Sequence, residues 1–447
     1  MSLEPTISIT RLAGRLLSGF LDRLQARVGQ ATLRSLLALG DQALVSGSRF
    51  AATVAIGRTC GAGELGTYGL CFTFVVLFSS ALQSLVTLPY TVYWKKRHAN
   101  RRDSHAGSIL LHFFALCLVA STTLLGASLI SALLPGGERM TRVFLTLSVF
   151  LPGLLLWEFA RRIGFAHLRV RAVFLLDFFA AILFVTSLTC LSLSGGLSAV
   201  TAYVVMGTLF GATAIIWLAH YGQAFRPNRR RAQLEAVRQW RFGRWILASE
   251  TLFMARGYAV PWLVAALLGT TSAGLFVAYL TIVALANPLL HGISNVLAPD
   301  LARAHVEEGM REVRRLVVKA TVALGAATLL LGIVLSIFGE SLVGLLYGEA
   351  FLGHPLCVII LATGFIAEAV GIPVYNGLWA VERSNACFVA CLGGLAATLL
   401  VTICLTPVWG LAGAAGGISI GRLTATVIQW VTFRRHVRNA TIVGAIA

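Results

Sequence analysis

Long apolar runs dominate the pattern of hydrophobic and polar positions along this chain. From residue 35 almost to the C-terminus, runs of about 20 residues alternate with short polar segments, and each run can cross roughly 30 Å of hydrocarbon as a helix. Backbone polar groups cannot stay unpaired in lipid, so such runs must be helical. The short alternating segments typical of a membrane β-barrel are not seen in this sequence. The pattern therefore predicts an all-α membrane protein with about twelve transmembrane helices.

The predicted helices form two groups of six. The first group covers 35–57, 66–92, 107–134, 143–160, 173–193 and 198–221, and the second covers 245–267, 272–297, 317–338, 355–380, 384–405 and 411–433. This division predicts five parts along the chain: a basic amphipathic segment (1–34), an N-lobe (35–222), a basic connector (223–244), a C-lobe (245–433) and a tail (434–447).

The positive charges indicate the orientation in the membrane. Of the 36 Lys and Arg residues, three fall in the loops of one side (Arg58, Arg139 and Arg142) and three inside predicted helices (Arg49, Arg256 and Arg422). The others lie in segments that twelve crossings place together on the opposite side. Cytoplasmic loops carry such an excess of Lys and Arg, so both termini are expected in the cytoplasm.

Composition supports the membrane class and excludes several others. The chain is 57% hydrophobic and 12% charged, whereas soluble domains are roughly 45–50% apolar and about 25% charged. The net charge of +18 does not indicate a nucleic-acid partner, because the basic residues lie in short segments between apolar runs and not on one folded face. The eight cysteines form no CxxC pair, so we expect no disulfide framework, no metal site and no cofactor.

The N-terminal segment leaves two interpretations open. Arg11, Arg15, Arg23 and Arg27 alternate with apolar residues at a spacing that would give a helix one basic and one apolar face. Such a helix could lie on the cytoplasmic leaflet. The alternative is a partly disordered tail.

Weak matches in the same order suggest that the two halves are repeats. Gln42 and Arg49 in the first helix match Ser249 and Arg256 in the seventh, at a shift of 207 residues. Gly66-Thr67-Tyr68 similarly matches Gly274-Leu275-Phe276. Two six-helix repeats enter the membrane from the same side, and in transporters with such repeats the substrate site lies between them.

Three arginines inside predicted helices are the main candidates for function. An arginine at the centre of a bilayer costs roughly 2.5–3.5 kcal/mol on insertion scales, so Arg49, Arg256 and Arg422 are expected to face an internal polar cavity. In the first helix, Gln42, Ser46, Arg49 and Thr53 form one polar stripe. Guanidinium groups converging from both halves would suit a phosphate or pyrophosphate.

Structural pairing of these arginines with acids is the alternative. Asp41 precedes Arg49 by eight residues, which places it about 80° away around the helix and makes a direct pair unfavourable. Glu250, six residues before Arg256, is worse placed. An ion pair between helices with Glu368 remains open. Asp41, Glu250 and Glu368 are also the candidates for cation or proton coupling. Glu158, which can pair with Arg162, and Asp177 lie beside basic blocks and are interpreted as charges at the membrane interface.

Five segments resemble those of a known family: Asp41 to Phe50, Ile56-Gly57-Arg58, Gly63 to Tyr68, Gly377 to Ala380, and Pro407 to Ala415. Through these segments the sequence resembles the bacterial polysaccharide flippases of the multidrug, oligosaccharidyl-lipid and polysaccharide exporter superfamily. The resemblance implies a two-lobed bundle in the bacterial cytoplasmic membrane that alternates between inward- and outward-facing forms. The implied cargo is an undecaprenyl-pyrophosphate-linked oligosaccharide, and the implied partners are this lipid-linked glycan, membrane lipids and other polysaccharide-assembly membrane proteins.

On this resemblance, Arg49 and Arg256 would attract the pyrophosphate, and Gln42, Ser46, Thr53 and Ser249 would offer hydrogen bonds. Three alternatives stay open at this point. A multidrug exporter of the same superfamily would use carboxylates such as Asp41 for a cationic cargo. A membrane glycan polymerase or glycosyltransferase usually carries its catalytic residues on long outer loops, and the longest one here, 339–354, is short. A scaffold without transport would not need arginines at the centre of the bilayer.

Overall fold

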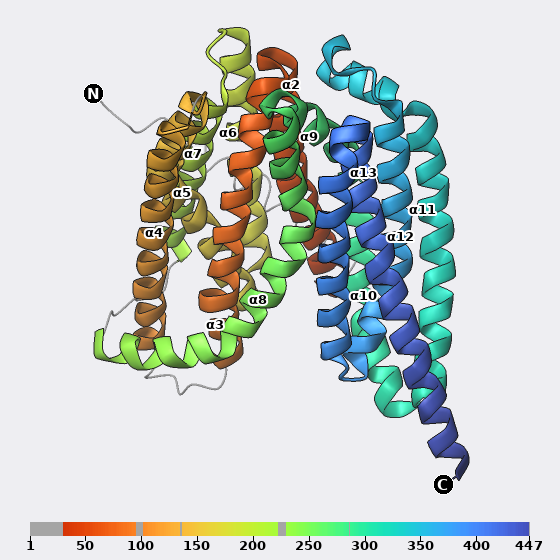
Figure 1. The fold of residues 1–447 in the computed structure, drawn as a ribbon. Coiled ribbons are helices and arrows are strands. Elements are labelled where there is room, and N and C mark those ends of the chain that lie inside the picture. The colour runs from red at the N-terminus through yellow and green to blue at the C-terminus, as the bar shows by residue number, and fades with distance from the viewer. Residues whose placement is uncertain (1–29, 95–101, 135, 222–228, 286, 447) are drawn as a thin grey trace.

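The computed structural model describes residues 30–94, 102–134, 136–221, 229–285 and 287–446, and these are almost entirely helical (Figure 1). The all-α prediction is confirmed. The elements of the N-terminal half are α2 (Gln30–Leu82), the π-helical turn η1 (Gln83–Thr87), α3 (Leu88–Trp94), α4 (Arg102–Ala132), α5 (Glu138–Ala166), α6 (Val170–Leu193) and α7 (Ala199–Tyr221). The elements that follow are α8 (Arg229–Leu268), α9 (Thr270–Ala284), α10 (Asn287–Glu307), α11 (Met310–Tyr347), the 3₁₀ turn η3 (Glu349–Phe351), α12 (Pro355–Ala380) and α13 (Ser384–Ile446).

Within these described residues, nine helices are long and apolar enough to cross a membrane. Two of them, Gly40–Tyr93 and Asn385–Arg438, have 54 residues each. A straight helix of that length would measure roughly 80 Å, more than twice the hydrocarbon thickness. Each contains a glycine with non-helical backbone angles, Gly61 (φ 82°) or Gly410 (φ 58°). Both glycines lie between two predicted crossings, so each long helix covers two of them; the number of crossings and the side of the termini stay predictions.

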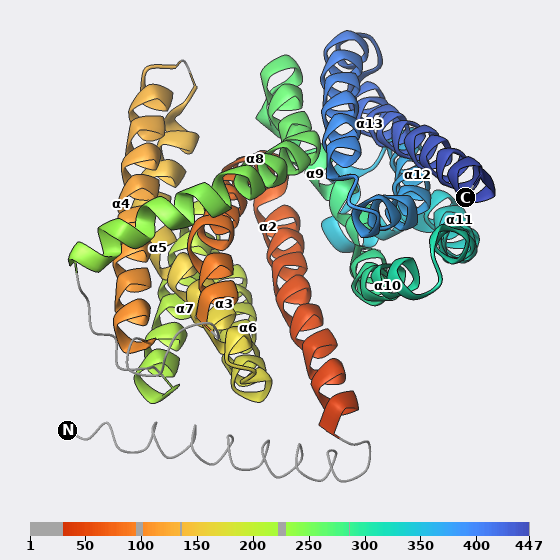
Figure 2. The same cartoon turned by 90° about the horizontal axis from the view of Figure 1, so that it is seen from below.

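Figures 1 and 2 show two groups of helices, one formed by α2 to α7 and the other by α9 to α13, with α8 running between them. We keep the names N-lobe and C-lobe for these groups, and we count the second part of α8, from residue 245 onward, with the C-lobe. The first part of α8 lies along the lower edge of the N-lobe in Figure 1, beside α3 and α4, before the helix turns up between the lobes. Its second part packs against α9 and α13. The predicted basic connector, where it is described, is therefore helical and continuous with the seventh predicted crossing.

Specific contacts hold the first part of α8 against the N-lobe. The imidazole of His112 in α4 lies 2.9 Å from the carbonyl oxygen of Ala232. Gly243 lies so close to the carbonyl oxygen of Ser84 in η1 that a Cβ at this position would clash with it. The large side chains Leu234, Trp240 and Trp245 stay exposed beside several arginines. A helix with exposed Trp and Arg is typical of the boundary between lipid and water.

The lobes meet where the predicted repeats match. A Cβ added to Gly66 in α2 would clash with the backbone of Thr270 and Gly274, and one added to Gly274 would clash with the carbonyl oxygen of Ala62. Gly61 and Gly269, just before these contacts, both have positive φ. The matched glycines Gly66 and Gly274 thus lie against each other, as expected for equivalent positions beside a two-fold axis that relates the repeats. At the same end, the Arg58 guanidinium donates a hydrogen bond to the carbonyl oxygen of Leu345 in α11.

Two further sequence predictions concern the chain ends. The amphipathic helix predicted within 1–34 lies almost wholly in residues 1–29, outside the described residues. At the other end, α13 continues as a helix to Ile446, so the predicted tail extends the last crossing instead of forming a separate segment.

Candidate functional site

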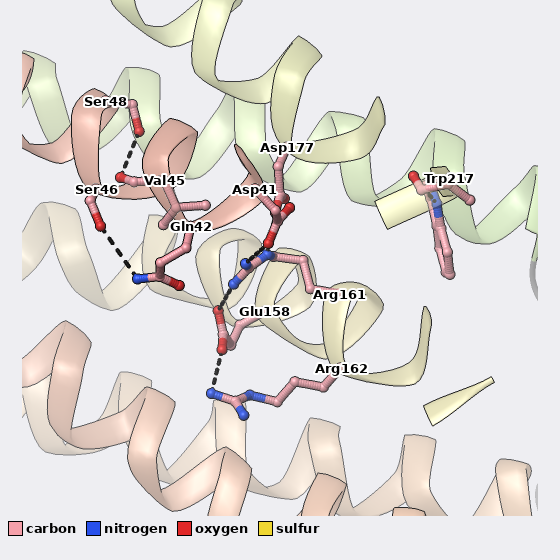
Figure 3. Close-up of polar contacts among 11 residues, drawn as sticks. Asp41, Gln42, Val45, Ser46, Ser48, Glu158, Arg161, Arg162, Asp177 and Trp217 are labelled. Atoms are coloured by element: carbon pink, nitrogen blue, oxygen red, sulfur yellow. Dashed lines mark hydrogen bonds and ion pairs between the residues drawn. The ribbon is translucent and has the colours of Figure 1, made fainter. Parts of the chain in front are cut away.

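An ionic cluster within the N-lobe is centred on Arg161 of α5 (Figure 3). Its guanidinium donates to Asp177 of α6 at 2.5 Å, to Asp41 of α2 at 2.7 Å and to Glu158 at 3.3 Å. Arg162 forms the predicted pair with Glu158, at 2.6 Å. Three carboxylates from three helices thus share two guanidinium groups. Because most of these side chains are buried, the cluster is expected to fix the relative positions of α2, α5 and α6.

The depth of Glu158 and Asp177 at the membrane interface stays a prediction, but the structure shows that neither is a solvated surface charge. Both side chains are buried in the N-lobe, with only 6% and 1% of their surface exposed. Because Arg161 follows the predicted helix 143–160, the sequence pattern places it among the cytoplasmic basic residues. The pattern does not predict its position at the centre of an ionic cluster. Three acids near the same ends of three predicted helices, with Glu158 and Arg161 three residues apart, are the signal that could have indicated it.

A second cluster lies in the C-lobe, where one carboxylate bridges two arginines. Glu368 of α12 accepts from Nη2 of Arg256 at 3.0 Å through Oε1 and from Nε of Arg422 at 3.1 Å through Oε2. The pair between Arg256 and Glu368, which the sequence left open, is therefore present. Each arginine uses one of its five N–H groups in these two bonds, so the cluster has donors left for a further anion.

Arg49 differs from the other two arginines inside the predicted helices. The structure records no ion pair for it in the described part of the chain. Its guanidinium lies over the ring of Phe72, 5.6 Å from the centroid. A half-buried cation with an aromatic neighbour is a suitable partner for an incoming anion.

The polar stripe of the first helix is partly present. Gln42 donates a hydrogen bond to Ser46 at 3.3 Å (Figure 3), and Thr53 accepts one from Tyr347 of the C-lobe at 3.3 Å. Ser249 and Glu250 are exposed on α8. The structure does not bring Arg49 and Arg256 together, since Arg256 points toward α12 and α13. Arg256, Arg422 and Glu368 form one group, and Asp41 belongs to the Arg161 cluster.

A pocket of about 230 Å³ lies between α2 and α8. Most of its wall is apolar. The lining residues are Thr73, Val76, Leu77, Thr251, Met254, Ala255, Tyr258, Ala259 and Trp262. One arginine without a recorded ion pair among the described residues, two arginines that share a carboxylate, and an apolar pocket together suit an amphiphilic anion better than a cation.

Comparison with known proteins identifies the family. Residues 97–354, more than half of the chain, match the family described as polysaccharide biosynthesis protein. This chain belongs to that family. The expected relation to polysaccharide exporters is confirmed at this level, and the arginines described above belong to a multi-pass membrane protein of polysaccharide biosynthesis.

One relative of this chain is also a protein of polysaccharide biosynthesis. The capsular polysaccharide biosynthesis protein CapF of Staphylococcus aureus is 26% identical over 170 residues, which are 38% of this chain and 43% of that protein. The match therefore takes in less than half of the length of that relative.

Solved structures confirm the fold. An inward-facing structure of a multidrug resistance MATE transporter of the MOP superfamily has a TM-score of 0.75 at 14% identity, covering 89% of this chain and 95% of that one. The lipid II flippase MurJ, in an inward closed conformation, has a TM-score of 0.66 at 13% identity, covering 90% of this chain and 87% of that one. The chain thus has the fold of these transporters.

Proposed function

We propose that this chain is a flippase that moves undecaprenyl-pyrophosphate-linked oligosaccharide repeat units across the bacterial cytoplasmic membrane by alternating access, for surface polysaccharide biosynthesis. The family and the transporter fold support this proposal. The observation that carries it is that three arginines inside the predicted helices, Arg49, Arg256 and Arg422, have a single carboxylate, Glu368, as their recorded partner among the described residues. Arg49 has no recorded ion pair, and Arg256 and Arg422 share Glu368.

The proposed roles follow from this arrangement. Arg49 from the N-lobe and the Arg256–Arg422 pair from the C-lobe bind the pyrophosphate in the states that expose them. Gln42, Ser46, Thr53 and Ser249 offer hydrogen bonds to phosphate or sugar. We place the two lobes at 35–222 and 245–433, with both termini in the cytoplasm. The other polysaccharide-assembly membrane proteins are proposed partners.

Export of cationic drugs, the alternative within the superfamily, has less support from the site. A cationic cargo would require carboxylates that are free to accept it. Asp41 is bound to Arg161, and Glu368 is bound to two arginines. Glu250 could act in proton or cation coupling of the flippase, and exchange of this residue for Gln tests that role.

The test is export of the surface polysaccharide in cells that depend on this chain. We expect Arg49→Ala and Arg256→Ala each to lower export by about tenfold or more at unchanged protein level, since a hydrogen bond to a charged group contributes ~1.5–3 kcal/mol. Arg49→Lys should be partly active, because it keeps the charge and loses the bidentate fork.

The matched control is Arg315→Ala, which removes an exposed arginine whose recorded ion pair is with Glu312 on the same helix. Its export should equal that of the wild type. Wild-type export by both Arg49→Ala and Arg256→Ala would rule out the proposed anion site. Full activity of Arg49→Lys would indicate that only the electrostatic field matters.

A further inference from the structure

The apolar pocket between the lobes is lined by residues of α2 and α8, none of which belongs to the Arg161 or Glu368 cluster. Thr73, Val76 and Leu77 come from the second part of α2, and the remaining lining residues come from α8. At one boundary, the indole Nε1 of Trp262 donates to the hydroxyl of Thr73 at 3.3 Å, and the Trp262 ring packs edge-on against Phe74. The pocket therefore exists only where an N-lobe helix faces a C-lobe helix.

The α8 helix presents two chemically different sides at this level. The lining residues Thr251, Met254, Ala255, Tyr258, Ala259 and Trp262 recur at intervals of three and four, so they share one helical face. Arg256 belongs to a different face, and its guanidinium binds Glu368 of α12. The pocket wall itself is thus kept free of the C-lobe charges.

A cation of the N-lobe, Arg49, lies beside the α2 wall of the pocket. Phe72, whose ring lies below the Arg49 guanidinium, directly precedes the lining residue Thr73. A cation without a recorded ion pair in the described part of the chain, beside an apolar pocket, matches a ligand with an anionic group attached directly to a hydrocarbon chain.

We propose that this pocket is the site for the first isoprenoid units of a polyprenyl pyrophosphate, with Arg49 holding the pyrophosphate to which they are joined. The proposal rests on the proposed function and adds the place where the lipid part is recognised. At about 230 Å³, the pocket is smaller than the roughly 300–1,000 Å³ of a complete small-molecule site. It therefore takes only the part of the chain next to the phosphate, and the rest of the tail stays in the membrane.

This placement gives the lipid a direct influence on the two lobes. Because α2 and α8 belong to different lobes, a ligand that fills the space between them binds one arrangement of the lobes more tightly than another. A ligand shifts a conformational equilibrium only by such a difference in affinity. Recognition of the lipid would thus be linked to the lobe motion.

The experiment uses the full chain purified in detergent and two soluble probes, farnesyl pyrophosphate and inorganic pyrophosphate, in calorimetric titrations. Ala255→Phe fills the pocket from α8, and Val76→Phe fills it from α2. Ala266→Phe is the matched control, because it makes the same change on an exposed part of α8 outside the pocket lining. Thermal unfolding of each variant shows whether it is folded, and either filled variant suffices for the test.

We expect the wild type to bind farnesyl pyrophosphate more tightly than inorganic pyrophosphate. The filled variants should lose about tenfold or more in affinity for farnesyl pyrophosphate, since each buried methylene contributes roughly 0.8 kcal/mol, and should keep their affinity for inorganic pyrophosphate. Ala266→Phe should bind both probes as the wild type does.

Other outcomes separate the pocket from the proposed function. The pocket proposal is overturned if a folded Ala255→Phe or Val76→Phe variant binds farnesyl pyrophosphate as tightly as the wild type does. It is also overturned if the wild type binds the two probes with equal affinity. In either case, weaker binding of inorganic pyrophosphate by Arg49→Gln would leave the proposed anion site in place. Wild-type binding of both probes by Arg49→Gln would remove the basis of the pocket proposal and of the anion site together.

Discussion

At the scale of single residues, the buried charges fall into two groups with opposite balance. In the N-lobe, Asp41, Glu158 and Asp177 gather around Arg161 and Arg162. In the C-lobe, two arginines share Glu368. A buried group left without its partner is destabilising, because it has lost its hydration and gains nothing in return. The N-lobe cluster is therefore expected to act on stability, and the C-lobe cluster on binding.

Arg161→Gln tests the structural role. The change leaves Asp41 and Asp177 without their recorded guanidinium partner, so it should destabilise the protein by about 3–5 kcal/mol. Arg162→Gln is the control: Arg162 is 30% exposed and its recorded bond is to Glu158, so its exchange should cost about 1 kcal/mol or less. Thermal unfolding in detergent measures both, and equal midpoints would contradict the central position of Arg161.

At the scale of helices, the closest approach between the lobes depends on two glycines. Gly66 in α2 and Gly274 in α9 lie backbone to backbone, where a Cβ on either would clash. Small residues allow helix backbones in membranes to approach in this way. This contact and the hydrogen bond from Arg58 to Leu345 join the lobes at the end of the bundle beside Gly61. We therefore expect the glycine contact to stabilise the closed state of that end.

Gly274→Val should separate the lobes at this end. The valine side chain would meet the carbonyl oxygen of Ala62, and the backbone can relieve the clash only by moving α9 away from α2. Spin labels are placed at the exposed positions Thr59 and Ser341 in a protein without native cysteines. Double electron–electron resonance should show a longer distance between the labels in Gly274→Val than in the parent protein.

The control for this change is Gly126→Val on α4, where an added Cβ would meet nothing within 4 Å. Its label distances should equal those of the parent protein. Unchanged distances in Gly274→Val would mean that the contact does not hold this end closed.

At the scale of the whole molecule, two lobes of similar construction are joined by α8 (Figure 1). Alternating access requires these lobes to separate at the end where they now touch. The contacts that must break include the bond from Arg58 to Leu345 and the bond from Tyr347 to Thr53.

A reversible cross-link across this end should stop export. Cysteines at Arg58 and Leu345, joined by a short reducible linker, would hold α2 against α11, and cleavage of the linker should restore export. The control pair is Ser128 and Thr141, which contact each other within the N-lobe, since Ser128 donates to the Thr141 carbonyl oxygen at 3.0 Å. Cross-linking the control pair should leave export unchanged. Continued export with the lobes linked would exclude opening at this end.

The sequence by itself determined the class, the positions of the helices and the presence of two repeats. These depend on local properties: the length of an apolar run and the order of similar segments. It also identified Arg49, Arg256 and Arg422, because the cost of a charge in hydrocarbon depends only on its depth along a helix.

Only the tertiary structure decided which partner each charge has. Arg161 binds Asp41 across 120 positions of sequence, and Arg256 binds Glu368 across 112. Helical periodicity fixes the face of one helix, but it does not fix how that face is rotated toward helices far away in the chain. For this reason the sequence left the pairing of Arg256 open and missed the Arg161 cluster. The pocket between α2 and α8 could not be predicted either, because its two walls belong to different lobes.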